Sequence, residues 1–247
     1  MEKYGRNFYA LETPGSLASA RAIVPELMSM FSPKSVVDVG CGVGAWLSVF
    51  RACGCRDIRG FDGRWVERDH LLIDPNDFSP IDIAAGAATD RRYDLALCLE
   101  VGEHLPSRDA EKLIDILVQS SDVIIFGAAI PHQGGKGHVN EQWPDYWMEK
   151  FEQRGYECFD YIRPRFWDAT GIEFWYVQNT FVYIRRSSPM MPARQSSGHE
   201  RLPTRAVHPR AWNRAFEGPS VSRVMSMLPV ALWRAIKYRN KPWPIGE

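Results

Sequence analysis

Short apolar runs alternate along the first 185 residues with longer segments in which apolar positions recur at helical spacing. The runs near 36–39, 93–100 and 123–126 are almost continuously apolar, and each is followed by glycine or polar residues. Such runs are typical of strands buried on both faces of a parallel sheet. Segments 17–31 and 110–118 instead place an apolar residue every three or four positions, as amphipathic helices do. The alternation predicts an α/β domain.

Weaker signals extend this pattern toward the C-terminal end of the domain. Strands are predicted at 58–62, 78–83 and 156–160, and a helix is predicted at about 145–153. The aromatic and β-branched run at 173–183 is also predicted as a strand, because such residues favour extended structure.

The first apolar run ends in a glycine-rich turn. Asp38 is followed by Gly40, Gly42 and Gly44, and a helical segment begins at Ala45. Strand, glycine turn and helix form the nucleotide-binding corner of a doubly wound sheet, since only glycine lets the backbone turn sharply against a ligand. The glycines stand at alternate positions, which differs from the G-x-G-x-x-G spacing of dinucleotide-binding turns.

A second acid lies about twenty residues past these glycines, a distance typical of the open α/β sheet. Asp62 ends the strand predicted at 58–62. At this position a sheet brings a carboxylate to a ribose diol, and one carboxylate can accept from both hydroxyls. Asp62 is therefore predicted to bind the ribose of a nucleoside cofactor.

Three motifs resemble class I S-adenosylmethionine-dependent methyltransferases. They are the D-x-G-x-G-x-G turn at 38–44, the string E-V-G-E-H-L-P at 100–106 and the loop G-H-V-N-E-Q-W-P at 137–144. The loop is similar to a bacterial subset usually tied to polysaccharide or natural-product sugars. The resemblance runs from about Phe8 to Arg185. It implies a doubly wound, Rossmann-like α/β sheet of seven strands in the order 3-2-1-4-5-7-6, with the last strand antiparallel.

The resemblance also implies a cofactor, S-adenosyl-L-methionine, with S-adenosyl-L-homocysteine as product. In that family the glycine turn holds the methionine part and the ribose. An acid after the third strand hydrogen-bonds the adenine amino group, with an apolar neighbour against the ring. The residues expected to contact the cofactor are Asp38, Gly40, Cys41, Gly42, Gly44, Asp62, Gly63, Asp82, Ile83 and Glu100.

Segment 128–144 follows a strand at its carboxyl end and is rich in glycine and polar side chains. Loops at this edge carry chemistry on a rigid scaffold, and so many polar groups are not readily buried in a core. We predict that the segment binds the methyl acceptor, with contacts from Gln133, Asn140, Gln142 and Trp143. Tyr9, ahead of a helix predicted to begin near Ser16, is a further candidate as part of a lid.

Two histidines are candidates for the general base that a hydroxyl acceptor needs. His138 lies in the acceptor loop and is preferred, whereas His104 follows the strand at 93–100. Glu141 and Glu103 are candidates to orient either ring. The same carboxylates can hold a divalent ion together with a histidine, but the sequence shows no metal site, so no metal is predicted.

The predicted activity is methyl transfer to a hydroxyl of a small molecule, a glycan or a nucleotide sugar. Two alternatives stay open. N-methylation of an amino sugar or another small amine needs an acceptor that is already deprotonated, so it depends less on a base. The other alternative is a non-catalytic module that binds S-adenosylmethionine, or nucleic acid through the basic tail. Nucleic acid is disfavoured, because the basic residues lie in a loose tail and not on a folded face with interleaved aromatic residues.

Charge divides the chain into two parts. The formal net charge is zero, but 12 of the 30 basic residues and only 3 of the 30 acidic residues lie from Arg185 onward. We predict a methyltransferase domain over 1–185, an irregular or disordered linker over 186–220 and a basic amphipathic helix over 221–247. That helix is expected to dock on the body, to join a second subunit in a homodimer, or to lie on a membrane surface.

The remaining features predict a cytoplasmic protein. No run of about 18 apolar residues exists to span a membrane, and the N-terminus lacks the apolar region of a secretory signal. The five cysteines are odd in number and lack metal-type spacing, which is typical of free thiols in a reducing compartment.

Overall fold

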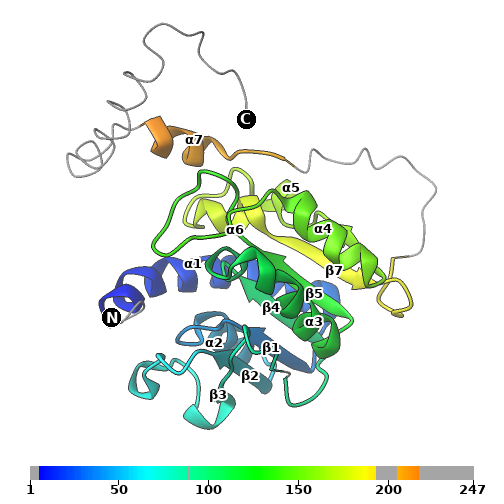
Figure 1. Ribbon diagram of the computed structural model, residues 1–247. Coiled ribbons are helices and arrows are strands. Elements are labelled where there is room, and N and C mark those ends of the chain that lie inside the picture. The colour runs from blue at the N-terminus through cyan, green and yellow to red at the C-terminus, as the bar shows by residue number, and fades with distance from the viewer. Residues whose placement is uncertain (1–5, 88, 193–204, 217–247) are drawn as a thin grey trace, which may run out of the picture. The chain divides into compact units, whose positions relative to one another are not determined.

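Seven strands form one sheet in the computed structural model, which describes residues 6–87, 89–192 and 205–216 (Figure 1). The strands are β1 Ser35–Val39, β2 Asp57–Asp62, β3 Phe78–Pro80, β4 Leu95–Leu99, β5 Val123–Gly127, β6 Tyr156–Phe159 and β7 Phe181–Arg185. Their order is β3-β2-β1-β4-β5-β7-β6, and β7 runs antiparallel to both of its neighbours. The predicted fold class, strand order and reversed strand are confirmed.

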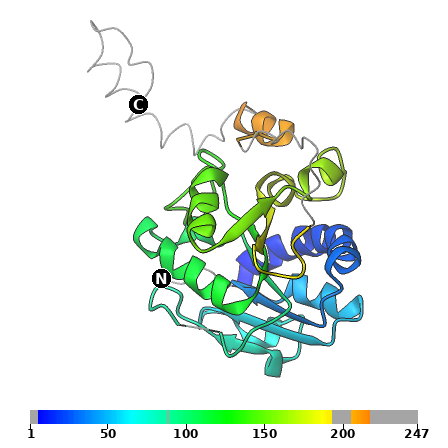
Figure 2. The same ribbon diagram turned by 90° about the vertical axis from the view of Figure 1, so that its right-hand side faces the viewer.

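Helices cover both faces of this sheet. The helices of this unit are α1 Arg6–Phe31, α2 Ala45–Ala52, α3 Ala110–Ser120, α4 Pro144–Gln153, α5 Arg163–Phe166 and α6 Phe174–Asn179. A further helix, α7 Pro209–Phe216, lies outside this unit. Single 3-10 turns stand at η1 Arg68–His70, η2 Pro75–Asp77, η3 Gly102–His104 and η4 Ser107–Asp109. Figure 2 shows α1, in blue, on one side of the sheet and α3, in green, on the other.

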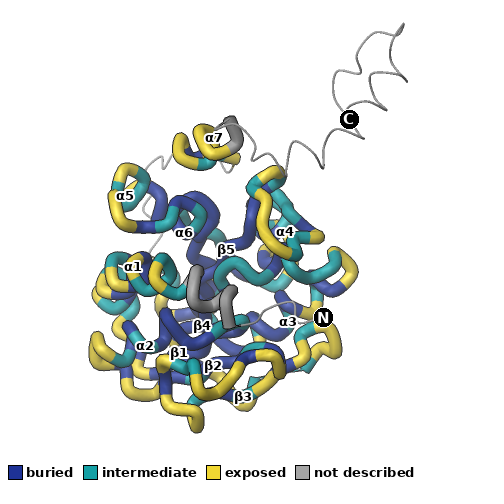
Figure 3. Tube along the Cα trace, turned by 90° about the vertical axis from the view of Figure 1, so that its left-hand side faces the viewer, coloured by how far each residue is buried: buried dark blue, intermediate teal, exposed yellow. Residues whose placement is uncertain are grey.

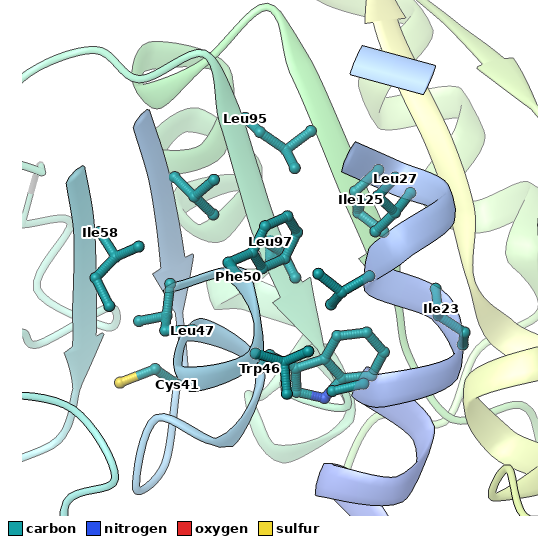
Figure 4. Close-up of a cluster of buried hydrophobic side chains, with 14 of the residues drawn as sticks. Ile23, Leu27, Cys41, Trp46, Leu47, Phe50, Ile58, Leu95, Leu97 and Ile125 are labelled. Carbon is teal, nitrogen blue, oxygen red and sulfur yellow. The ribbon is translucent and has the colours of Figure 1, made fainter. Parts of the chain in front are cut away.

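Alternate residues of the central strands point to opposite faces, as the pleat of a strand requires. Leu95 and Leu97 of β4 belong to an apolar cluster under α1 and α2, whereas Ala96 and Cys98 belong to a second cluster under α3 and α4. Figure 4 shows the first cluster, in which Trp46 of α2 lies over the strands. The central strands are buried along their length, as the dark blue tube of Figure 3 shows. Burial on both faces explains their continuous apolar runs.

The strand predicted at 173–183 is wrong in its first half. Residues Phe174–Asn179 form helix α6, and only Phe181–Arg185 form a strand. Aromatic and β-branched residues favour strands, but tertiary packing overrides this preference here. Phe174 and Val177, three residues apart on the helix, are both buried, and the ring of Tyr176 meets Trp46 edge to face at 5.1 Å.

Two other boundaries differ from prediction. The first helix begins at Arg6 and continues through Pro14, although a start near Ser16 was expected. Within it the Ser16 hydroxyl hydrogen-bonds the hydroxyl of Tyr176 at 2.8 Å, so Ser16 holds α1 against α6. The third strand ends at Pro80, because Asp82 forms a turn in which its Oδ1 accepts from the amide of Ala85 at 3.1 Å.

The predicted linker 186–220 contains a helix, so its description as irregular is wrong for Pro209–Phe216. Proline is favoured at the first position of a helix, and the alanines and arginines that follow are good helix formers. The chain divides between His208 and Pro209 into two compact units, and α7 is the described helix of the second. The helix predicted over 221–247 and the side chain of Tyr9 lie outside the described residues.

None of the helices described has the length and apolar character needed to cross a membrane. The five cysteines are free thiols.

Candidate active site

The turn after β1 requires glycine for two separate reasons. Gly40 and Gly44 have φ angles of 87° and 81°, in the left-handed region that side chains disfavour. A Cβ atom on Gly40 would also come within 2.2 Å of the Val101 side chain, and one on Gly44 within 2.9 Å of Ile73. The turn therefore packs closely against neighbouring loops at the carboxyl edge of the sheet, where ligands of doubly wound folds bind.

Asp62, the last residue of β2, fastens this turn. Its Oδ2 accepts from the amide of Gly42 at 2.7 Å, and its Oδ1 accepts from the amide of Gly63 at 2.6 Å. Burial raises the pKa of the Asp62 carboxyl, while these donors and the Trp65 side chain oppose the rise. A carboxylate offers about four accepting positions. Accepting capacity therefore remains for a ribose hydroxyl, and the site fits the predicted nucleoside.

Asp38 lies in the middle of this edge and is only 3% exposed. Burial, with a smaller contribution from the charge of Asp62, raises the pKa of Asp38 to about 8. Burial likewise keeps the Cys41 thiol neutral by raising its pKa well above the usual value. The two carboxyls are thus electrostatically coupled across the glycine turn.

The remaining cofactor candidates follow β3 and β4. Asp82 is exposed and Ile83 half-buried, both just beyond the end of β3 at the same edge. Contact of either residue with an adenine ring stays a prediction.

Glu100, directly after β4, has an unusual backbone and a fully engaged side chain. Its φ of 56° is rare for a residue other than glycine and costs of order 1–3 kcal/mol, a strain that gathers at functional sites. Its Oε1 accepts from Asn179 at 2.8 Å and its Oε2 accepts from Gln133 at 2.9 Å. Burial raises the pKa of Glu100, and these amide donors counteract that rise. Gln133, expected to contact the acceptor, thus also supports Glu100.

Glu103 is fully buried at the start of the loop after β4. Among the described residues, no group hydrogen-bonds either oxygen of its carboxylate. Burial first, and then the neighbouring charge of Glu100, raise the pKa of Glu103 well above its usual range. The amides of Glu103 and Ala129 lie near enough to favour the charged form, without reaching the geometry of a hydrogen bond. Glu103 orients neither histidine by a hydrogen bond, in contrast to one of the two predicted roles.

The backbone of Glu103 anchors the acceptor loop. Its carbonyl accepts from the amides of Val139 at 2.8 Å and of Asn140 at 3.0 Å. These bonds hold the loop between β5 and α4 against the loop after β4. The motifs at 100–106 and 137–144 are therefore in contact.

This anchoring brings the two candidate bases together. The rings of His104 and His138 are 4.9 Å apart between centroids and nearly perpendicular. Glu141 lies 2.8 Å from Nδ1 of His138 and also accepts from the amides of His132 and Gly134. The predicted orienting role of Glu141 fits this geometry, because the carboxylate is itself fixed by the loop backbone.

The other acceptor candidates occupy different positions in the loop. Asn140 is buried, and its Oδ1 accepts from Gln142 at 3.0 Å. Trp143 is half-buried and lies under the guanidinium of Arg205, 5.8 Å from its ring centroid. Gln142 and Trp143 have surface available to an acceptor, whereas Asn140 acts mainly inside the loop.

Three further polar residues contribute to this part of the structure. Asn179 and Gln178 lie in the segment that was predicted as a strand, and they reach the site from α6. His208, in the segment predicted as linker, donates its amide to Gln178 at 2.8 Å, and its Nε2 lies 2.7 Å from the carbonyl of Trp167. No pattern around His208 distinguishes it from the surrounding Arg and Pro residues.

Known proteins resemble this chain in sequence and in fold. Residues 18–168 match the family described as a methyltransferase domain. The chain belongs to this methyltransferase family.

A stretch of this methyltransferase is 36% identical over 90 residues to the ubiquinone biosynthesis O-methyltransferase of Nitrosomonas europaea. The match covers 34% of this chain and 38% of that relative.

Solved structures are similar in fold. One is SAM-bound CalS10, an amino pentose methyltransferase from Micromonospora echinaspora, with 14% identity and a TM-score of 0.52 over 71% of this chain and 94% of that one. Another is magnesium protoporphyrin IX methyltransferase from Synechocystis PCC 6803 with bound SAH, with 18% identity and a TM-score of 0.50 over 74% of this chain and 91% of that one. At these identities the similarity supports the fold.

Proposed function

We propose that this methyltransferase transfers the methyl group of S-adenosyl-L-methionine to a hydroxyl of a small molecule, a sugar or a sugar-bearing metabolite. The pairing of Glu141 with His138, beside the ring of His104, carries the proposal. It lies at the sheet edge where ligands of doubly wound folds bind. A hydroxyl acceptor requires such an oriented imidazole, since its proton must leave as the methyl group arrives.

The donor is S-adenosyl-L-methionine, which is bound in one solved structure of the same fold, while its product SAH is bound in another. Asp62 holds the ribose in this proposal, and the glycine turn lets the backbone approach the methionine part. In this proposal Asp82 and Ile83, just beyond the end of β3, contact the adenine ring.

The reaction is an in-line displacement. The acceptor oxygen attacks the methyl carbon, an O–C bond forms and the C–S bond breaks. The electron pair of that bond stays on sulfur, so S-adenosyl-L-homocysteine leaves. In the simplest form of the proposal, the hydroxyl proton passes to His138 as general base. Much of the acceleration comes from holding the two reacting atoms about 3 Å apart in line.

The acceptor loop supports a sugar-like substrate. Side-chain amides of Gln133 and Gln142 offer both donors and acceptors, which suit neighbouring hydroxyls. In the same loop Val139 is exposed and Trp143 is half-buried, so an apolar sugar face or an attached group has a surface to contact. A protein of the same fold acts on an amino pentose, which is compatible with this class.

N-methylation of an amino sugar is the second candidate. A neutral amine carries its own electron pair and needs no proton acceptor at the moment of attack. Loss of an imidazole should therefore reduce N-methylation much less than O-methylation.

The test is a methyl-transfer assay with labelled donor and parallel panels of neutral sugars, nucleotide sugars and amino sugars. Methylation of a hydroxyl compound is expected, and His138→Ala should lower it by at least ~100-fold, as loss of a general base does. His132→Asn is the matched control, because His132 is exposed in the same loop and Asn tolerates its φ of 70°. Methylation confined to amines, with His138→Ala retaining activity, would contradict the proposal.

A further inference from the structure

The acceptor side of the site contains a cluster with the ligands of a metal centre. Glu103, His104 and His138 each place a ligand atom so that all three lie within 4.8 Å of one another. Two imidazoles and one carboxylate form a donor set for a divalent transition metal, and three protein ligands leave coordination positions open.

The state of Glu103 is an independent indication of a cation. Its side chain is 0% exposed, and neither carboxylate oxygen has a hydrogen-bond partner among the described residues. Buried carboxylates are normally paired, hydrogen-bonded or bound to a metal, because an unpaired one is costly. One carboxylate oxygen lies within 4.8 Å of a ring nitrogen of each histidine, so a cation bound among the three groups would satisfy it.

The surroundings of His138 have the features of a supported ligand. Oε1 of Glu141 lies 2.8 Å from Nδ1 of His138. The other ring nitrogen, Nε2, is therefore the one that would bind a metal. A carboxylate on the remote nitrogen fixes the ring and raises its basicity in many metal sites. The carboxylate of Glu141 is in turn held by the amides of His132 and Gly134.

We propose that Glu103, His104 and His138 bind one divalent transition-metal ion, whose open positions take oxygen atoms of the methyl acceptor. Two imidazole ligands favour a metal such as Co²⁺ or Zn²⁺ over Mg²⁺ or Ca²⁺, and the carboxylate also suits Mn²⁺. The expectation that no metal is present is thereby revised.

The catalytic role of the ion, unlike its binding, rests on the proposed O-methyl transfer. A hydroxyl coordinated to a divalent cation loses its proton more easily, just as metal-bound water does. The proton then passes to water, and the oxygen attacks the methyl carbon as before. His138 acts in this case as a ligand in place of a free base. An acceptor with two neighbouring hydroxyls suits the open positions.

Direct binding tests the site without knowledge of the acceptor. The full chain is treated with chelator, desalted and titrated with CoCl₂ or MnCl₂ alone, with calorimetry and the Co²⁺ absorption spectrum as readouts. Wild type is expected to bind one equivalent. Glu103→Gln, which keeps shape and removes the charge, should weaken binding by at least ~10-fold, the minimum seen when even an outer partner is lost. Glu149→Gln, at an exposed glutamate on α4, should bind as wild type does.

Thermal melting separates ligand loss from unfolding. Without metal, Glu103→Gln should melt at or above the wild-type temperature, because a neutral amide of the same shape is no more costly to bury than the carboxyl that it replaces. Added Co²⁺ should raise the melting temperature of wild type only, since a ligand stabilises the state that binds it. Absence of binding by wild type, or equal binding by wild type and Glu103→Gln, would overturn the proposal.

Titration of the same samples with S-adenosyl-L-methionine keeps the two proposals apart. If the chain binds S-adenosyl-L-methionine but no metal, the metal-site proposal is wrong. Methyl transfer with His138 as base then still stands as a proposal. If the chain binds the metal but methylates only amines, the proposed O-methylation is wrong. The metal-site proposal then still stands.

Discussion

The Oδ2 atom of Asp62 accepts a hydrogen bond from the amide of Gly42 at 2.7 Å, so the end of β2 holds the glycine turn that follows β1. The two residues are 20 positions apart in the chain, yet the parallel register of β1 and β2 brings both to one edge. The carboxylate of Asp62, which is proposed to bind the ribose, and the glycine turn are thus one structural unit.

Asp62→Ala should therefore weaken binding of S-adenosyl-L-methionine by at least ~10-fold, because a hydrogen bond to a charged group contributes roughly 1.5–3 kcal/mol. The loss combines a missing ribose contact with a loosened turn. Calorimetric titration measures the affinity, and Asp69→Asn, an exposed acid on η1, is the control. An unchanged affinity for Asp62→Ala would remove Asp62 from the cofactor site.

Asp38 should make stability fall as pH rises. Its carboxyl has a pKa of about 8 in the folded chain and near 4 in an unfolded one. Between these values the folded chain binds the extra proton, so raising the pH lowers the free energy of unfolding until the folded pKa is passed. The effect at pH 8 is on the order of a few kcal/mol.

Asp38→Asn removes this dependence. The variant should melt at a higher temperature than wild type at pH 8, and the difference should shrink toward pH 5. Melting curves at pH 5 and pH 8 measure this difference, with Asp69→Asn as a control for surface charge. A difference that stays constant with pH would show that Asp38 carries no proton in the folded chain.

Much of this site follows from local sequence patterns. The glycine turn at 38–44 and Asp62 were predictable because strand, turn and next strand are each signalled locally, and strand pairing fixes their meeting point. The loop at 137–144 was identified because its polar residues have no place in a core.

Other features depend on contacts between distant segments. The sequence shows that Asn179 is polar, but not that it hydrogen-bonds Glu100, 79 positions away. That contact depends on α6, a helix in a segment that was predicted as a strand. Glu103 reads as an ordinary loop acid, and only packing reveals that its carboxylate is buried without a partner. Neither propensity nor spacing encodes such burial.

Glu141 should act as a positioning residue for His138. Glu141→Gln keeps the size of the side chain but replaces an anionic acceptor with a neutral amide at Nδ1. Metal affinity and methyl transfer are each expected to fall by ~10–100-fold, as when outer partners of ligating histidines are removed. Binding of S-adenosyl-L-methionine should not change, since Asp62 and the glycine turn lie elsewhere.

A purely structural role for Glu141 predicts something different. It would lower the melting temperature and donor affinity together, without a specific effect on Co²⁺ binding. Titrations of Glu141→Gln with Co²⁺ and with S-adenosyl-L-methionine distinguish the two cases, and Glu149→Gln, an exposed glutamate on α4, is the matched control.

Asn179 should stabilise the fold through Glu100. Its Nδ2 donates to Glu100 at 2.8 Å and to Gln133 at 3.0 Å, and its Oδ1 accepts from Gln178 at 2.9 Å. Asn179→Ala leaves a half-buried, strained glutamate with one donor fewer, so the free energy of unfolding should fall by ~1–3 kcal/mol.

Urea unfolding measures this change, with Gln119→Ala, an exposed amide on α3, as the control. Glu100→Gln separates the sources of the loss. If the energy lies in the charged hydrogen bond, Asn179→Ala should cost less in the Glu100→Gln background than in wild type, because interacting residues are not additive. Equal costs in both backgrounds would mean that Asn179 stabilises α6 by packing alone.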